Sequence, residues 1–205
     1  MARDLARPTS DPRTAPWRPA AVLVSGPPAT GKSTLAAALA PRLGAAILDL
    51  DVATGPLTRL ICGLTGVRDL ADPTLTGLTR DARYRTLLDL ADANLRAGLP
   101  VVLVAPFSAE RARPAAWAAT VRRIAAEPTM VWLHLPPAEL IRRLTQRALA
   151  RDADKIRAPE SFLAGLDLGP PAVPHLALDA SQPTAALVRS VLDHLSRKAG
   201  PPCST

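Results

Sequence analysis

Residues 26–34 read Gly-Pro-Pro-Ala-Thr-Gly-Lys-Ser-Thr, which fits the pattern Gly-x-x-x-x-Gly-Lys-Ser/Thr. An apolar run of strand length, 20–25, precedes this stretch, and leucines at positions 35, 39 and 43 follow it at helical spacing. Between a strand and a helix, such a stretch forms a phosphate-binding loop. Its glycines let successive N–H groups point inward, and the helix N-terminus adds partial positive charge. The sequence therefore predicts a nucleoside triphosphate site.

The chemistry of that loop assigns a role to its two most polar side chains. We expect Lys32 to reach the β- and γ-phosphates and the Ser33 hydroxyl to bind Mg²⁺. The alternative, a chance glycine-rich turn before a helix, is disfavoured because the chain has only three lysines, one of which stands here. The residues expected to bind the nucleotide within the loop are Gly26, Pro27, Pro28, Ala29, Thr30, Gly31, Lys32, Ser33 and Thr34.

The composition limits the class of protein. The 205 residues suit one domain, and the net charge of +7 comes almost entirely from arginine. A basic chain can bind nucleic acid, but aromatic residues make up only 3% of it, too few for a base-stacking platform. The two cysteines make no disulfide framework, and no uncharged apolar run is long enough to span a membrane. We therefore expect a cytoplasmic protein whose arginines surround a nucleotide.

Five apolar runs of strand length alternate with helical patterns, which indicates an α/β fold. We expect a three-layer sandwich around a five-stranded parallel sheet, in the strand order 2-3-1-4-5 of P-loop NTPase kinases. The domain should cover 20–197, between a flexible arm at 1–19 and a flexible tail at 198–205. The predicted strands are 20–25, 45–48, 100–105, 129–134 and 175–179.

Two acids follow the second predicted strand. Strand alternation would place Asp49 and Asp51 on one face, at the sheet edge where ligands of α/β proteins gather. We interpret Asp51 as the base that accepts a proton from a substrate hydroxyl, and Asp49 as a residue that holds Mg²⁺ or its waters. The alternative is a solvated strand end or an N-cap of the next helix.

Two further segments are candidates for the substrate and for a lid. The segment 52–80, with a short helix around 57–64, is expected to form the acceptor site. A cationic stretch at about 143–158 fits a lid whose guanidinium groups grip phosphate oxygens, although a solvated helix face is the alternative. The candidate acceptor residues are Thr54, Arg59, Arg80 and Arg83, and the candidate lid residues are Arg147, Arg151 and Lys155.

A resemblance to a known family rests on five segments that occur in the expected order. They are 26–34, Leu-Asp-Leu-Asp at 48–51, 98–107, Trp-Leu-His-Leu-Pro-Pro at 132–137, and Arg-x-x-x-Arg-Asp-x-x-Lys at 147–155. From about 20 to 195 the chain resembles bacterial AAA ATP-binding proteins of the zeta-toxin-like and chloramphenicol-phosphotransferase-like P-loop kinase group.

This resemblance implies Mg²⁺- and ATP-dependent phosphorylation of a hydroxyl group on a small molecule. It implies that Asp51 is the base and that Lys32 is catalytic. It also implies a lid of Arg147, Arg151 and Lys155, whose two arginines are catalytic because they offset charge on the transferring group. Relatives commonly have aspartate where this chain has Val104, so Asp49 or Asp51 would have to supply the missing acid. A polynucleotide or nucleotide-sugar kinase and a non-catalytic ATP-binding switch are the alternatives, and the acceptor is left open.

Overall fold

The computed structural model describes residues 20–67, 73–124, 126–147 and 152–199. The expected arm at 1–19 and positions 200–205 of the expected tail lie outside the described residues, as do five positions of the acceptor segment, 68–72, and four of the lid, 148–151.

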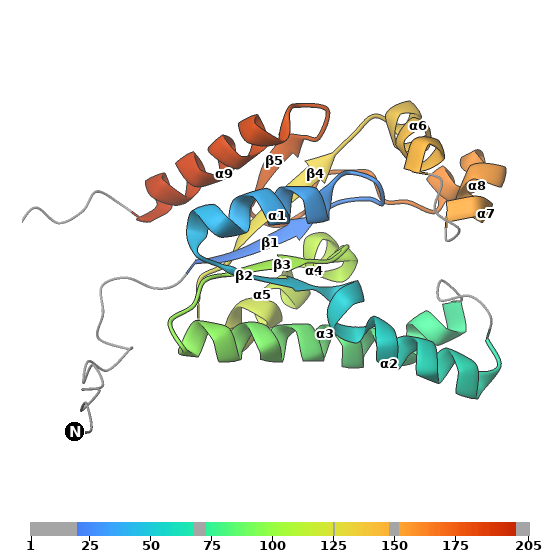
Figure 1. Ribbon diagram of the computed structural model, residues 1–205, viewed down its shortest axis with the longest axis horizontal. Coiled ribbons are helices and arrows are strands. Elements are labelled where there is room, and N and C mark those ends of the chain that lie inside the picture. Colours follow the sequence, from blue (N-terminus) through green and yellow to red (C-terminus); the bar gives the residue numbers. More distant parts are fainter. Residues whose placement is uncertain (1–19, 68–72, 125, 148–151, 200–205) are drawn as a thin grey trace, which may run out of the picture.

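The predicted sheet is confirmed. Its five strands are all parallel and follow the order β2-β3-β1-β4-β5, so each crossover carries helices to one or other face (Figure 1). The strands are β1 (Ala21–Ser25), β2 (Ala46–Asp49), β3 (Val101–Val104), β4 (Thr129–His134) and β5 (His175–Asp179).

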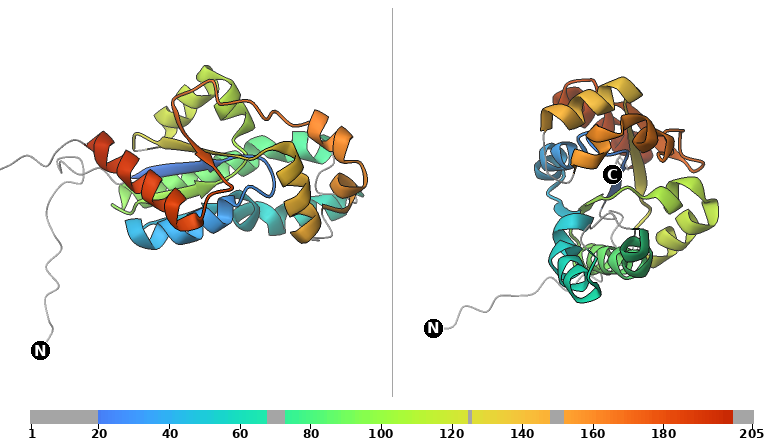
Figure 2. Two further views of the ribbon diagram at one scale, coloured as in Figure 1. Left: turned by 90° about the horizontal axis from the view of Figure 1, so that it is seen from above. Right: turned by 90° about the vertical axis from the view of Figure 1, so that its right-hand side faces the viewer.

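Helices cover both faces of the sheet and its carboxyl edge. Side chains alternate along β1, so Val22 and Val24 pack under α1 and α9, whereas Leu23 packs on the opposite face with Leu87 of α3 and Ile124 after α5. Helices α6, α7 and α8 stand together beyond the carboxyl ends of the strands (Figure 2). The helices are α1 (Lys32–Leu43), α2 (Leu50–Thr65), α3 (Pro73–Arg96), α4 (Ser108–Ala112), α5 (Pro114–Arg123), α6 (Pro137–Arg147), α7 (Ala153–Arg157), α8 (Pro159–Ala164) and α9 (Thr184–Ala199).

The second strand differs from its prediction as a buried strand. Strand β2 lies at the edge of the sheet and pairs only with β3, which leaves the Ile47 side chain 45% exposed. The expected strand alternation of Asp49 and Asp51 is also wrong, because α2 begins at Leu50. Asp49 is the N-cap of this helix and Asp51 lies in its first turn.

The segment between the second and third strands is more helical than the sequence indicated. Helix α2 continues to Thr65, well past the short helix expected at 57–64, and α3 already begins at Pro73 with Gly77 inside it. The short helices α4 and α8 lie in segments that carry no clear helical pattern in the sequence. Tertiary packing of α2 against α3 overrides the glycines as local helix breakers. Among the described helices, none is long and apolar enough to cross a membrane.

Candidate active site

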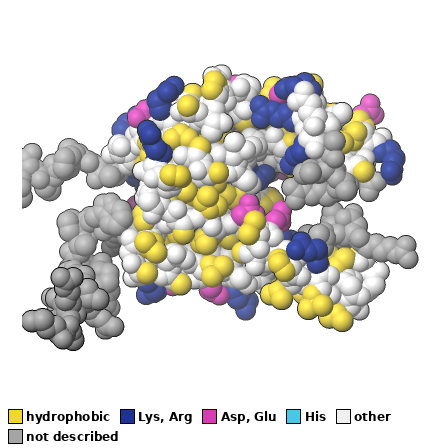
Figure 3. Space-filling view, viewed as in Figure 1, with side chains coloured by type: hydrophobic (Ala, Val, Ile, Leu, Met, Phe, Trp, Pro, Cys, Tyr) yellow, Lys and Arg dark blue, Asp and Glu magenta, His cyan; other side chains and the backbone are white. Residues whose placement is uncertain are grey.

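A cavity of about 630 Å³ lies at the carboxyl ends of β1, β2 and β3. It opens in the space-filling view as a recess between the upper and lower halves of the molecule, with acidic and basic side chains around it (Figure 3). Its walls come from the loop before α1, the β2–α2 junction, α3, the loop after β3, and α6 and α7. This size suits a small-molecule site.

The loop at 26–34 has the backbone that its glycines predict. Gly26 has φ 147 and Gly31 has φ 85, and Ala29 between them is also left-handed at φ 64. A Cβ atom on Gly26 would lie 2.5 Å from the carbonyl oxygen of Leu133, so only glycine fits there. The curled loop ends at the first residue of α1, Lys32.

The lysine side chain crosses its own loop. Lys32 Nζ donates hydrogen bonds to the carbonyl oxygens of Gly26 and Pro27, both at 2.8 Å, and the Thr30 hydroxyl donates to the Pro27 oxygen at 2.9 Å. These hydrogen bonds to Gly26 and Pro27, and from Thr30, hold the loop in its curled shape. The residues of the predicted nucleotide loop that line the cavity are Pro28, Ala29, Gly31, Lys32, Ser33 and Thr34.

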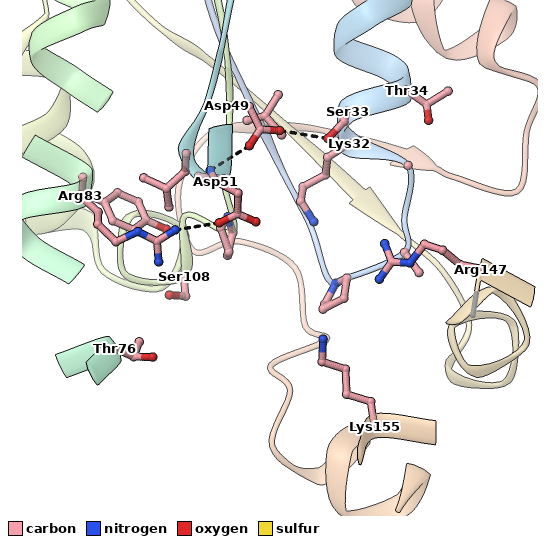
Figure 4. A pocket seen from close by; sticks show the side chains of 18 of the residues that line it. Lys32, Ser33, Thr34, Asp49, Asp51, Thr76, Arg83, Ser108, Arg147 and Lys155 are labelled. Atoms are coloured by element: carbon pink, nitrogen blue, oxygen red, sulfur yellow. Dashed lines mark hydrogen bonds and ion pairs between the residues drawn. The ribbon is translucent and has the colours of Figure 1, made fainter. Parts of the chain in front are cut away.

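Ser33 and Asp49 meet at the base of the cavity (Figure 4). The Ser33 hydroxyl donates to Asp49 Oδ2 at 3.1 Å, while Asp49 Oδ1 accepts the backbone N–H of Asp51 at 2.9 Å. Asp49 is therefore the N-cap of α2, as one sequence-based alternative predicted, and also a neighbour of Ser33. Val104 stands beside Asp49 in register on β3, so Asp49 supplies the carboxylate at this edge of the sheet.

A hydroxyl beside a carboxylate fits the oxygen ligands that Mg²⁺ prefers. Among the described residues, no group of three or more His, Cys, Asp or Glu side chains could hold a metal ion. A divalent ion at Ser33 and Asp49 would therefore need oxygen ligands from phosphates and water, as Mg²⁺ commonly has.

Asp51 faces the cavity, and its carboxylate forms an ion pair with Arg83 of α3. Arg83 Nη2 lies 2.7 Å from Asp51 Oδ1 (Figure 4), and Arg83 Nε donates to the Thr54 hydroxyl at 2.9 Å. The Asp51 side chain is 72% exposed, so it remains accessible despite the ion pair. Asp51, Arg80 and Arg83 line the cavity, whereas Thr54 is buried behind it and the exposed Arg59 lies outside the lining.

Tyr84 is buried and packs beneath Arg80. The Arg80 guanidinium carbon stands 4.4 Å above the centre of the ring, and the Tyr84 hydroxyl accepts the Phe107 N–H at 3.1 Å. Burial raises the pKa of Tyr84 to about 12, so its hydroxyl stays protonated at neutral pH and is unsuited to act as a base.

Two cationic side chains of the predicted lid, Arg147 and Lys155, form ion pairs with one buried acid, Asp152. The Asp152 side chain has no exposed surface and accepts hydrogen bonds from Arg147 Nε and Lys155 Nζ, each at 2.9 Å. Burial raises the pKa of Asp152, but the hydrogen bonds from Lys155 and Arg147 outweigh it and hold the pKa below its ordinary value. Arg147 and Lys155 line the cavity, and the predicted lid residue Arg151 lies outside the described residues.

Sequence reasoning assigned no role of their own to two residues of the lid segment, one outside the cavity lining and one in it. Asp152 was visible only as the acid three positions before Lys155, a spacing that brings two side chains together on a helix. Arg143 also lines the cavity: it pairs with Glu139 at 2.9 Å and donates to the Ala180 oxygen at 2.9 Å. Hydrogen bonds from Arg142 and Arg143 lower the pKa of Glu139 to about 2, so Glu139 is ionised at neutral pH.

The lining is basic overall. Among the described residues that line the cavity, six carry a positive charge and two a negative one; they are Lys32, Arg80, Arg83, Arg143, Arg147 and Lys155, against Asp49 and Asp51. Such an excess, together with the N-terminus of α1, favours an anionic ligand.

The sheet order, with the glycine-rich loop between β1 and α1, defines the P-loop nucleotide-binding fold of the kinase type. Within that class the chain belongs to the AAA domain family, whose family model matches residues 22–166. A search of curated proteins found no match.

Solved kinases share this fold at low sequence identity. A sugar kinase from Janibacter sp. HTCC2649 aligns with a TM-score of 0.63 and 19% identity over 87% of this chain and 95% of that one. A gluconokinase from Sinorhizobium meliloti 1021 aligns with a TM-score of 0.58 and 22% identity over 88% and 94%. The Mycobacterium tuberculosis APS kinase, in complex with AMPPNP and APS, aligns with a TM-score of 0.60 and 18% identity over 87% and 98%.

Proposed function

We propose that the protein is a kinase that transfers the γ-phosphate of ATP to a hydroxyl group of a small molecule. One observation carries the proposal: the exposed Asp51 carboxylate and the loop lysine Lys32 line the same cavity. The solved sugar kinase, gluconokinase and APS kinase of the same fold support this reaction class. Membership of the zeta-toxin-like and chloramphenicol-phosphotransferase-like subgroup is part of the proposal.

The nucleotide side of the cavity is assigned to the loop and the lid. The N–H groups at the start of α1 favour phosphate, and Lys32 would exchange its contacts with the Gly26 and Pro27 oxygens for phosphate oxygens. Arg147 and Lys155 reach the cavity from the other side, where they would grip the triphosphate. Arg151 is proposed to join them.

Ser33 and Asp49 would hold Mg²⁺, which in phosphoryl transfer neutralises charge on the β- and γ-phosphates. Asp49 is proposed to take over from the aspartate that relatives have at the position of Val104, a role supported by its place beside Val104 on the neighbouring strand.

The acceptor side is assigned to Asp51. The acceptor oxygen attacks the γ-phosphorus, its proton passes to Asp51, the bond from the γ-phosphorus to the β–γ bridging oxygen breaks, and ADP leaves. Arg83 orients the Asp51 carboxylate through its 2.7 Å contact. Lys32 and Arg147 would offset the charge that spreads over the transferring group. The closed lid would exclude water that otherwise hydrolyses ATP.

The decisive measurement is ADP release with and without a panel of hydroxylated small molecules, followed by mass analysis of the acceptor. We expect an acceptor to stimulate ADP release and to gain one phosphoryl group, and Lys32→Ala to weaken both ATP binding and turnover. A phosphorylated oligonucleotide or nucleotide sugar would favour the corresponding alternative kinase. ATP binding with no acceptor-dependent turnover would favour the non-catalytic switch.

A further inference from the structure

Arg80 uses little of its hydrogen-bonding capacity. Its guanidinium group has five N–H donors. Within the described residues it makes one hydrogen bond, a long one of 3.4 Å from Nη2 to Glu110 Oε2, and its next nearest carboxylate is that of Asp81 at 3.9 Å. The Arg80 side chain is only 29% exposed and lines the cavity. Most of its donors therefore lie at the cavity wall without a strong acceptor among the described residues.

The packing around Arg80 holds it in place. The group stands over the Tyr84 ring, and Tyr84 is itself fixed by the Phe107 N–H. Glu110, which holds one end of the guanidinium, is buried with 7% exposure. A planar guanidinium that is stacked on an aromatic face presents its fork of donors in a set direction. This arrangement is suited to binding a carboxylate or phosphate with two parallel hydrogen bonds.

The neighbouring arginine on the same helix is used differently. Arg83 donates hydrogen bonds from Nε to the Thr54 hydroxyl and from Nη2 to the Asp51 carboxylate. Its role is therefore to hold Asp51, the proposed base, in place. Thr76 and Ser108 also line this side of the cavity, away from the lid residues Arg147 and Lys155 (Figure 4). Arg80 thus stands on the acceptor side rather than the nucleotide side.

The geometry points to an acceptor that carries an anionic group, a carboxylate or a phosphate, which Arg80 binds while the acceptor hydroxyl lies at Asp51. A guanidinium stays charged at any physiological pH, and a neutral acceptor that displaced water from it would offer its donors only uncharged hydroxyl oxygens, which form weaker hydrogen bonds than a carboxylate or phosphate does. An anionic acceptor satisfies them. This inference rests on the proposed kinase function and adds the chemical class of its substrate.

Matched acceptors test the inference directly. One set is glycerol, glycerate and glycerol 3-phosphate, and the other is sorbitol, gluconate and sorbitol 6-phosphate; ADP release and the mass of the product are measured for each. We expect at least one anionic member to be phosphorylated far faster than its neutral counterpart, and the two anionic arms separate carboxylate from phosphate recognition. Turnover of a neutral member at an equal or higher rate overturns the inference and leaves the kinase function standing. If no compound in this or a wider hydroxylated panel stimulates ADP release, the kinase proposal fails and the inference falls with it.

Variants on α3 show whether Arg80 is responsible. We expect Arg80→Gln to raise the KM of the anionic acceptor about ten- to a hundredfold, the usual effect of losing hydrogen bonds to a charged group, with a much smaller effect on the KM of ATP. Arg80→Lys should restore part of the affinity. Arg85→Gln, at an exposed position of the same helix outside the cavity lining, is the matched control and should leave both constants unchanged. An equal rise in KM for the neutral counterpart, or from the Arg85 variant, would contradict the assignment.

Discussion

The Arg83 guanidinium lies 2.7 Å from the Asp51 carboxylate and joins the start of α2 to α3 across 32 positions of sequence. Because the Asp51 side chain is 72% exposed, the ion pair contributes little to the free energy of folding. Its main effect is to orient the Asp51 carboxylate toward the cavity that Lys32 also lines.

Asp51→Asn tests the proposed base. An amide is of similar size but cannot accept the acceptor proton, so we expect kcat to fall by about 10²- to 10⁴-fold. The dissociation constant of ATP, measured by calorimetry, should change less than about twofold because the proposed nucleotide contacts lie elsewhere in the cavity. Asp193→Asn, at an exposed acid of α9 outside the cavity lining, is the control. Turnover that survives in the Asp51 variant would remove Asp51 from the mechanism.

Asp49 has two separable roles. Asp49→Asn keeps a side-chain oxygen that can cap α2 but removes the charge, so we expect the Mg²⁺ concentration for half-maximal activity to rise while the melting temperature stays close to that of the wild type. Asp49→Ala removes the cap as well and should cost about 1 kcal/mol of unfolding free energy. A Mg²⁺ titration of both variants, with thermal melts alongside, separates the roles. Unchanged Mg²⁺ dependence in both would show that Asp49 acts only as a cap.

Asp152→Asn tests the buried acid of the lid. The amide leaves Arg147 and Lys155 without their shared carboxylate, and we expect weaker ATP binding because both cations lose their fixed position. If Asp152 acts through Arg147, then adding Arg147→Ala to the Asn variant should weaken ATP binding less than it does in the wild type. Asp167→Asn, which removes the carboxylate paired with the buried Arg111 outside the cavity lining, is the matched control. Full additivity of the Asp152 and Arg147 effects would contradict the coupling.

The same acid predicts a dependence of stability on pH. The pKa of Asp152 is lower in the folded protein than its ordinary 3.8, so its ionised form stabilises the fold above that value. This contribution is lost as the pH falls from 3.8 through the folded pKa. Urea unfolding should therefore show the wild type more stable than Asp152→Asn at pH 7, with the difference shrinking below about pH 4. A difference that is constant down to pH 3 would show that the charge of Asp152 does not matter.

Gly26→Ala tests the closeness of the loop to the sheet. The added Cβ would meet the Leu133 oxygen at 2.5 Å in a backbone at φ 147, so we expect a loss of about 2–3 kcal/mol and weaker ATP binding. Gly44→Ala is the matched control, because Gly44 is also left-handed at φ 59 but has open space at its Cβ position. It should cost only about 1 kcal/mol and leave ATP binding intact. Equal effects of the two substitutions would show that the contact with Leu133 is unimportant.

Local patterns predicted much of the fold. The strands β1, β3, β4 and β5 were visible as short apolar runs, and α1 as leucines at helical spacing that end at Gly44. The start of α2 was left open between a strand end and an N-cap, because the alternating acids 49 and 51 fit both, and the structure shows the cap. The exposure of Ile47 was missed because an edge strand and a central strand can carry the same apolar sequence.

The sequence by itself determined the phosphate-binding loop, since the glycines, Lys32 and the helix that follows are adjacent in the chain and their chemistry is local. Only the tertiary structure decided which distant side chains meet there. Arg83 of α3 reaches Asp51 of α2, and Arg80 of α3 reaches Glu110 of α4. The physical reason is that several of these contacts form where separate helices pack around the carboxyl edge of the sheet, and neither spacing nor composition encodes that packing.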